Sequence, residues 1–141
     1  MITTVIAMLA FAVSAQAAPE GASPKQASAQ AAPSSAAVDA ARSWLALVDA
    51  GKWQESFAAT TSSFQSLNTV QIWQSASEQA RVPLGRMLSR TAISEESVPT
   101  PPAGHQVVRF RTDFANKAGA IETVSLAREG GEWRIAGIYI D

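Results

Sequence analysis

Residues 106–140 read QVVRFRTDFANKAGAIETVSLAREGGEWRIAGIYI, and this stretch decides the fold. Apolar and polar side chains alternate in residues 106–114, which is the period of a β-strand with one buried face. Residues 121–128 and 133–140 follow as two further strands. The pair Gly130-Gly131 between them favours a tight hairpin turn, because glycine accepts the positive φ angles of a type I′ turn. With a turn at residues 116–119, the stretch predicts three consecutive antiparallel strands.

The chain before this stretch adds one strand and three helices. Residues 86–98 are predicted to form the first strand, which ends at Pro99. Earlier, the apolar period changes to that of a helix, and it predicts helices over residues 37–50, 52–58 and 69–81. Ser34 or Ser35 caps the first helix, and Asn68 with Gln71 has the spacing of a capping box. Helices followed by a strand meander predict an α+β fold, with three N-terminal helices packed on a curved four-stranded antiparallel sheet.

The N-terminal segment has the pattern of an export signal. Residues 2–13 are apolar and uncharged, and Ala15 and Ala17 give the small residues that a signal peptidase accepts. We expect a signal peptide over residues 1–17 with cleavage after Ala17, and a periplasmic or secreted mature chain. Residues 18–35 are rich in Ala, Pro, Ser and Gln, which predicts a disordered spacer before a single domain at residues 36–141.

Composition excludes several classes of function. The 141 residues contain no cysteine and one histidine, and the net charge is −1. Nucleic-acid binding is therefore not expected, because it needs a surplus of basic residues. Without cysteine there are no disulfides and no thiolate chemistry. His105 alone cannot form a metal site, and we predict no metal, no cofactor and no membrane span in the mature chain.

The two faces of the predicted sheet differ less in hydrophobicity than expected for a sheet with one face in solvent. The face toward the helices is predicted to carry Val108, Phe110, Thr112, Phe114, Ile121, Ile138 and Ile140. The opposite face would then carry Val107, Val124, Leu126, Trp133, Ile135 and Tyr139. Such an apolar patch favours a homodimer through the sheet. The alternative is a bulge near Gly137 that turns some of these side chains inward.

Several segments resemble a known family. They are Ala41-Arg42-Ser43-Trp44-Leu45, Arg81-Val82-Pro83-Leu84-Gly85, and Trp133-Arg134-Ile135-Ala136-Gly137. In this order they resemble the domain of unknown function family 4019, which occurs in exported bacterial proteins. The resemblance covers about residues 38–140. It implies a cone fold like that of nuclear transport factor 2 and a place in the cell envelope, and it implies no activity.

One candidate chemistry is that of a small cavity enzyme. Cone folds host isomerases and hydratases that use acidic and tyrosine side chains, and here Asp113, Glu122 and Tyr139 are the comparable groups. A four-residue turn would place Asp113 opposite Glu122, so that each carboxylate perturbs the pKa of the other. If the turn is shifted by one pair, Arg111 lies opposite Glu122 instead. These residues then form an ordinary surface salt-bridge ladder, and we favour this interpretation.

The leading hypothesis is a non-enzymatic binding module. Its candidate ligand residues are Trp44, Trp73, Phe110 and Arg81. The ligand would be a small amphipathic molecule or an envelope protein. Arg81, Arg86 and Arg90 could line a cavity for an anion, although solvated arginines at a strand start explain the same residues.

Overall fold

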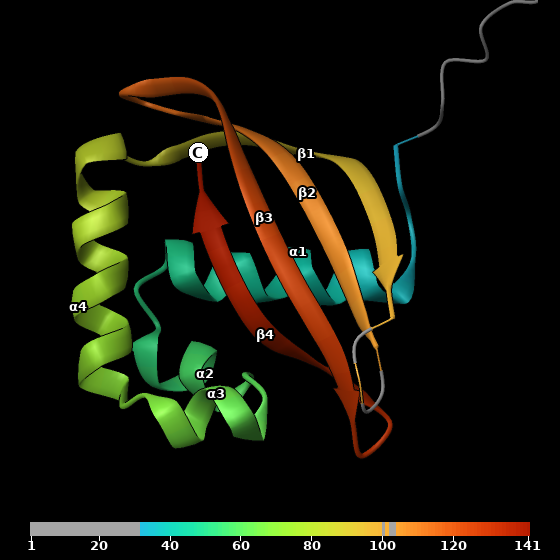
Figure 1. The fold of residues 1–141 in the computed structure, drawn as a ribbon. Coiled ribbons are helices and arrows are strands. Elements are labelled where there is room, and N and C mark those ends of the chain that lie inside the picture. Colours follow the sequence, from blue (N-terminus) through green and yellow to red (C-terminus); the bar gives the residue numbers. More distant parts are fainter. Residues whose placement is uncertain (1–31, 100, 102–103) are drawn as a thin grey trace, which may run out of the picture. The chain divides into compact units, whose positions relative to one another are not determined.

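The computed structural model describes residues 32–99, 101 and 104–141. The predicted signal peptide and most of the predicted spacer lie outside these residues. From Ala32 to Asp141 the chain forms one unit, in which the helices come first and the sheet follows (Figure 1). The α+β fold predicted from the sequence is confirmed. Among the described residues, no helix is both long and apolar enough to cross a membrane.

Helix α1 (Ala36–Asp49) crosses one face of the sheet and supplies one side of the core (Figure 1). The hydroxyl of Ser35 accepts a hydrogen bond from the Val38 N–H at 3.2 Å, so one of the two predicted caps is used. The apolar stripe of α1 packs against the middle of the sheet. The buried core combines Val38, Ala41, Trp44, Leu45 and Val48 with Val108, Phe110, Val124, Leu126 and Ile135.

Helices α2 (Trp53–Ala58), α3 (Ser62–Leu67) and α4 (Val70–Arg81) follow, and a 3₁₀ turn, Val82–Leu84, ends the helical half. The sequence predicted three helices, so α3 is a correction. Thr61 caps α3 by accepting from the Phe64 N–H. The cap of α4 is Thr69, which accepts from the Ile72 N–H. Asn68, expected in that role, instead donates to the Phe64 carbonyl at 2.9 Å.

A buried serine ties the helices together. Ser56 of α2 is fully buried, and its hydroxyl accepts from the Trp73 indole N–H at 2.9 Å. Its carbonyl accepts from the Trp44 indole N–H at 2.8 Å. The rings of Trp44 and Trp73 lie 5.5 Å apart, and Phe64 meets Trp73 edge to face at 5.9 Å. Both indole groups are therefore satisfied inside the aromatic core.

The sheet is an antiparallel meander in the order β1-β2-β3-β4. Its strands are β1 (Met87–Val98), β2 (His105–Phe114), β3 (Lys117–Glu129) and β4 (Glu132–Ile140). Arg128 faces Trp133 across the glycine turn, as expected for that hairpin. The predicted bulge is also present: residue 136 is an extra residue in β4, so Gly137 pairs with Ser125 while Ile135 pairs with Leu126.

The turn between β2 and β3 differs from the prediction. It contains two residues rather than four, and Phe114 pairs with Lys117. An irregularity at Asp113 then moves the register, so that Glu122 pairs with Phe110 rather than with Asp113 or Arg111. Relative to the favoured pairing of Glu122 with Arg111, the register has moved by one residue. Because strand side chains alternate between the two faces of a sheet, this shift reverses the predicted faces of β3.

The reversed faces of β3 and the bulge in β4 together remove the predicted apolar patch. Val124, Leu126 and Ile135 are buried in the core, and Trp133 packs against it. Of the six residues expected on the outer face, only Val107 and Tyr139 remain there, while Ile121 leaves the inner face. The homodimer through the sheet was predicted from that patch, so this argument for it no longer holds, and dimerisation itself stays a prediction.

Candidate functional site

The register of β3 places a carboxylate inside the molecule. Glu122 shares the helix-facing side of the sheet with Phe110 and Thr112, and its side chain is 0% exposed. Burying a charge without partners is strongly unfavourable. The surroundings of Glu122 therefore have to supply positive charge and hydrogen-bond donors.

Both carboxylate oxygens of Glu122 accept hydrogen bonds. Oε1 accepts from Arg90 Nε at 2.7 Å and from the Thr112 hydroxyl at 2.5 Å. Oε2 accepts from Arg81 Nη1 at 3.0 Å. The donors come from three different elements: β1, β2 and the last turn of α4.

A second carboxylate closes the arrangement. Asp49, the last residue of α1, accepts from Arg90 through Nη1 at 2.7 Å and Nη2 at 3.1 Å, and also from Arg81 Nη2. Two arginines and two acids thus form a neutral ring, which we call the Glu122 ring: Asp49, Arg81, Arg90 and Glu122. The ring connects α1, α4, β1 and β3.

Arg90 is the most buried cation of the ring, with a side chain 5% exposed. Burial by itself lowers the pKa of its guanidinium, because it disfavours the charged form. The hydrogen bonds to Asp49 and Glu122 outweigh this effect and raise the pKa. Arg90 therefore stays charged over the whole physiological pH range.

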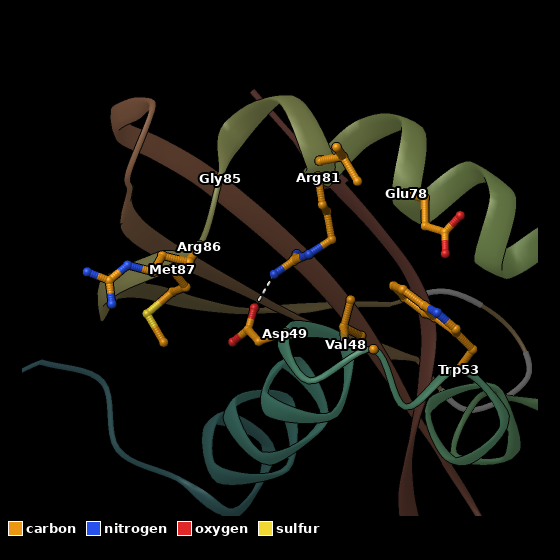
Figure 2. Close-up of a pocket in the computed structure, with 10 residues that line it drawn as sticks. Val48, Asp49, Trp53, Glu78, Arg81, Gly85, Arg86 and Met87 are labelled. Atoms are coloured by element: carbon orange, nitrogen blue, oxygen red, sulfur yellow. Dashed lines mark hydrogen bonds and ion pairs between the residues drawn. The ribbon is translucent and has the colours of Figure 1, made fainter.

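An open hollow of about 460 Å³ lies beside the Glu122 ring. We call it the Arg81 pocket. Figure 2 shows the Arg81 guanidinium directed at Asp49, with Trp53 and Glu78 on one side and Arg86 and Met87 on the other. Val48, Trp53 and Met87 give the pocket apolar walls, and charged groups stand at its rim.

Arg86 differs from the other arginines of this region. Arg81 and Arg90 are each paired with two carboxylates. Among the described residues, no carboxylate lies within ion-pair distance of Arg86, whose side chain is exposed at the rim of the Arg81 pocket. It is therefore the cation of this pocket that is available to a ligand.

The three residues of the predicted enzyme site do not meet. Glu122 lies inside, whereas Tyr139 lies on the outer face and is 55% exposed. Asp113 accepts from the Gly119 N–H at 2.7 Å and pairs with Ser89, so it closes the β2–β3 turn. Both oxygens of Glu122 already accept hydrogen bonds from Arg81, Arg90 and Thr112, and the Glu122 side chain is 0% exposed. The register of β3 therefore separates Asp113 from Glu122, and the predicted pair of carboxylates does not form.

The four predicted ligand residues have different positions. Trp44 and Phe110 fill the core. Arg81 joins the Glu122 ring and lines the Arg81 pocket. Trp73 belongs to the aromatic core and reaches a second, smaller hollow next to β4. In the part of the chain that the structure describes, no cluster of three metal-ligating side chains occurs, and His105 begins β2.

Sequence reasoning missed Asp49 and Thr112. One signal was available for Asp49: a carboxylate in the last turn of a helix is unfavourable against the helix dipole. No basic residue accompanies it in that turn of α1, so a cationic partner from elsewhere in the fold was needed. Thr112 was placed on the correct face, but nothing in the sequence indicated its partner.

The fold and this site define a small α+β domain with a neutral buried ion ring. Residues 40–138 match the family described as "Protein of unknown function (DUF4019)", and the chain belongs to that family. The searches found no match among curated proteins and none among solved structures. The likeness to the cone fold of nuclear transport factor 2 therefore stays a prediction.

Proposed function

We propose that this protein is an exported, non-enzymatic module that binds a small amphipathic anion in the Arg81 pocket. One observation carries the proposal. Arg86, an exposed arginine with no carboxylate within ion-pair distance in the part of the chain that the structure describes, stands at the rim of an apolar hollow of about 460 Å³. Binding sites typically combine apolar walls with a few polar groups that fix the orientation of the ligand.

The walls and the rim suggest the chemistry of the ligand. Val48, Trp53 and Met87 suit a short aliphatic or aromatic body. Arg86 suits a carboxylate or a phosphate, because its guanidinium presents a planar set of donors to these anions. Asp49 and Arg81 neutralise each other within the Glu122 ring, so they contribute shape more than charge.

Titration with octanoate and with octanol tests the proposal. These probes share an apolar body, and only octanoate carries an anionic head. We expect octanoate to shift the NMR signal of the Trp53 indole N–H at lower concentration than octanol does. The variant Arg86→Gln should weaken octanoate binding about tenfold, as expected for one charge-assisted hydrogen bond.

Arg111→Gln is the matched control, because Arg111 is an exposed arginine of β2 outside the pocket. It should leave octanoate binding unchanged. Equal binding of octanoate and octanol, or octanoate binding that survives Arg86→Gln, would contradict the proposal.

A further inference from the structure

β4 is an edge strand, and part of its outer edge carries no partner in the described structure. Ile121 and Asp141 exchange both backbone hydrogen bonds, at 3.2 and 3.0 Å. In an antiparallel ladder bonded and non-bonded pairs alternate, so the N–H and C=O groups of Ile138 and Ile140 point away from β3. Among the described residues, no backbone or side-chain group hydrogen-bonds these outward groups.

The same edge already accepts an extended segment at its other end. Thr60 forms a parallel bridge with Ile135. The Thr61 N–H donates to the Ile135 carbonyl at 2.8 Å, and the Ile135 N–H donates to the Ala59 carbonyl at 3.1 Å. This backbone pairing ends at Ile135. Farther along the same edge, Ile138 and Ile140 have no such partner among the described residues.

An apolar hollow lies beneath the unpaired part of the edge. We call it the β4 edge pocket; it measures about 130 Å³ and lies between β4 and α4. Its lining includes Val48, Trp73, Ser77, Ala80, Ile138 and Ile140. The side chains of Ile138 and Ile140 face the helices, as those of their partners Val124 and Glu122 do.

The β4 edge pocket contains a buried hydroxyl without a partner. Ser77 is 5% exposed, and its Oγ forms no hydrogen bond within the described structure. A buried polar atom left unsatisfied is unfavourable by about 1–3 kcal/mol. Its position on the pocket wall leaves room for a partner that enters from outside.

We propose that the β4 edge binds an extended peptide, which pairs with Ile138 and Ile140 and inserts one aromatic side chain into the β4 edge pocket. A residue that pairs with this edge places its side chain on the helix-facing side, directly over the pocket. A cavity of about 150 Å³ accepts benzene, so 130 Å³ suits a single aromatic ring. Tyrosine is the side chain that fits best, because its hydroxyl can bond Ser77 Oγ.

This occupant accounts for three separate observations. Strand addition satisfies the outward backbone groups, the ring fills the hollow, and its polar tip reaches Ser77. A lipid chain would use only the hollow. The β4 strand of a second copy could pair with the edge but could not fill the pocket. Its own Ile138 and Ile140 side chains already line the β4 edge pocket of that copy.

The test uses a blocked five-residue peptide, Thr-Val-Tyr-Val-Thr, and two relatives with Phe or Ala in the centre. The expected result is slowed hydrogen exchange at the outward amides of Ile138 and Ile140 and a shift of the Trp73 indole signal. The tyrosine peptide should bind about fivefold more tightly than the phenylalanine peptide, which corresponds to one hydrogen bond. The alanine peptide should not bind measurably.

Variants of the chain separate the three contacts. Ser77→Ala should remove the preference for tyrosine over phenylalanine. Ala80→Phe should fill the β4 edge pocket and abolish binding, whereas Ser75→Phe on an exposed position of α4 should not. Ile140→Pro deletes an outward donor but no bond to β3, so the sheet should persist while peptide binding weakens.

Three results would overturn the proposal. They are equal binding by the wild type and Ala80→Phe, peptide-induced shifts confined to the Arg81 pocket or the outer sheet face, and a dimer in sedimentation that the peptide does not dissociate. This site and the Arg81 pocket use different probes and different variants. Failure of one proposal is therefore distinguishable from failure of the other.

Discussion

At the scale of single residues, Glu122 has the most demanding position in the molecule. It is a charged side chain with no exposed surface, held by Arg81, Arg90 and Thr112. A buried ion pair is not by itself strongly stabilising, because desolvation of the charges offsets much of their attraction. Removing one partner is different, since it leaves the other charges buried and unpaired.

Glu122→Gln should therefore destabilise the domain by about 3 kcal/mol or more. The amide keeps the shape of the carboxylate but leaves Arg81 and Arg90 to share Asp49 as the one anionic partner that the described residues give them. Urea unfolding followed by tryptophan fluorescence measures the change. Asp113→Asn, which alters a half-buried carboxylate at the β2–β3 turn, is the control and should have a smaller effect, about 1 kcal/mol.

The raised pKa of Arg90 gives a second residue-scale prediction. A folded-state pKa above the unfolded value contributes stability that is fully present below the unfolded pKa. That contribution is lost only as the pH rises through the folded value. The unfolded pKa of arginine is far above about pH 10.

The difference in unfolding free energy between the wild type and Glu122→Gln should thus be the same at about pH 8 and about pH 10. The subtraction removes most contributions from groups outside the Glu122 ring. Urea titrations of both proteins at the two pH values check this. A difference that shrinks toward pH 10 would show that Arg90 loses its proton in this range.

At the scale of elements, the short helix α2 acts mainly through Ser56. One residue of a six-residue helix accepts the indole N–H groups of Trp44 and Trp73, and so links α1 with α4. Such a short helix has little stability of its own. Its place in the fold is maintained by these contacts and by aromatic packing.

Ser56→Ala should cost about 1–3 kcal/mol, because it leaves the buried Trp73 indole N–H without an acceptor. The backbone acceptor of Trp44 is unaffected. Ser66→Ala is the matched control, since Ser66 is exposed on α3 and should change stability by less than about 0.5 kcal/mol. Equal effects of the two variants would show that the Ser56 hydroxyl does not link the helices.

At the scale of the whole molecule, residues on the helix-facing side of the sheet form the core and so determine whether the domain folds. Leu126 has no exposed surface and pairs with Ile135 on the neighbouring strand β4. The outer face that was expected to hold Leu126 in a dimer interface does not contain it. Substitutions at this position therefore act on folding rather than on association.

Leu126→Arg should unfold the domain, because it buries an unpaired charge in the core. Circular dichroism should show loss of the native signal, and sedimentation should not show a folded monomer derived from a dimer. Arg111→Leu, on an exposed position of β2, is the control that should stay folded. A folded, monomeric Leu126→Arg protein would contradict the register of β3.

Export is also a property of the whole chain, and it remains a prediction from residues 1–17. N-terminal sequencing of protein from a periplasmic extract should begin at Ala18. Substitution of Ala15 and Ala17 by Glu should block cleavage, because the peptidase requires small side chains there. Full-length chain recovered from the cytoplasm would contradict the proposed export.

Local sequence determined most of the elements. The helical period specified α1, α2 and α4, alternation specified the inner face of β2, and paired glycines specified the β3–β4 turn. These features depend on neighbours a few residues apart, which is why the sequence alone predicts them. Helix α3 was missed because its polar, serine-rich stretch has no apolar period to mark it.

Tertiary structure alone decided the site. A two-residue turn and a bulge of one residue reversed the faces of β3, and so moved Glu122 from an expected surface ladder to the interior. Its partners Arg81 and Arg90 lie 41 and 32 residues away along the chain. No local pattern records such contacts, because register is fixed only when the whole sheet packs against the helices.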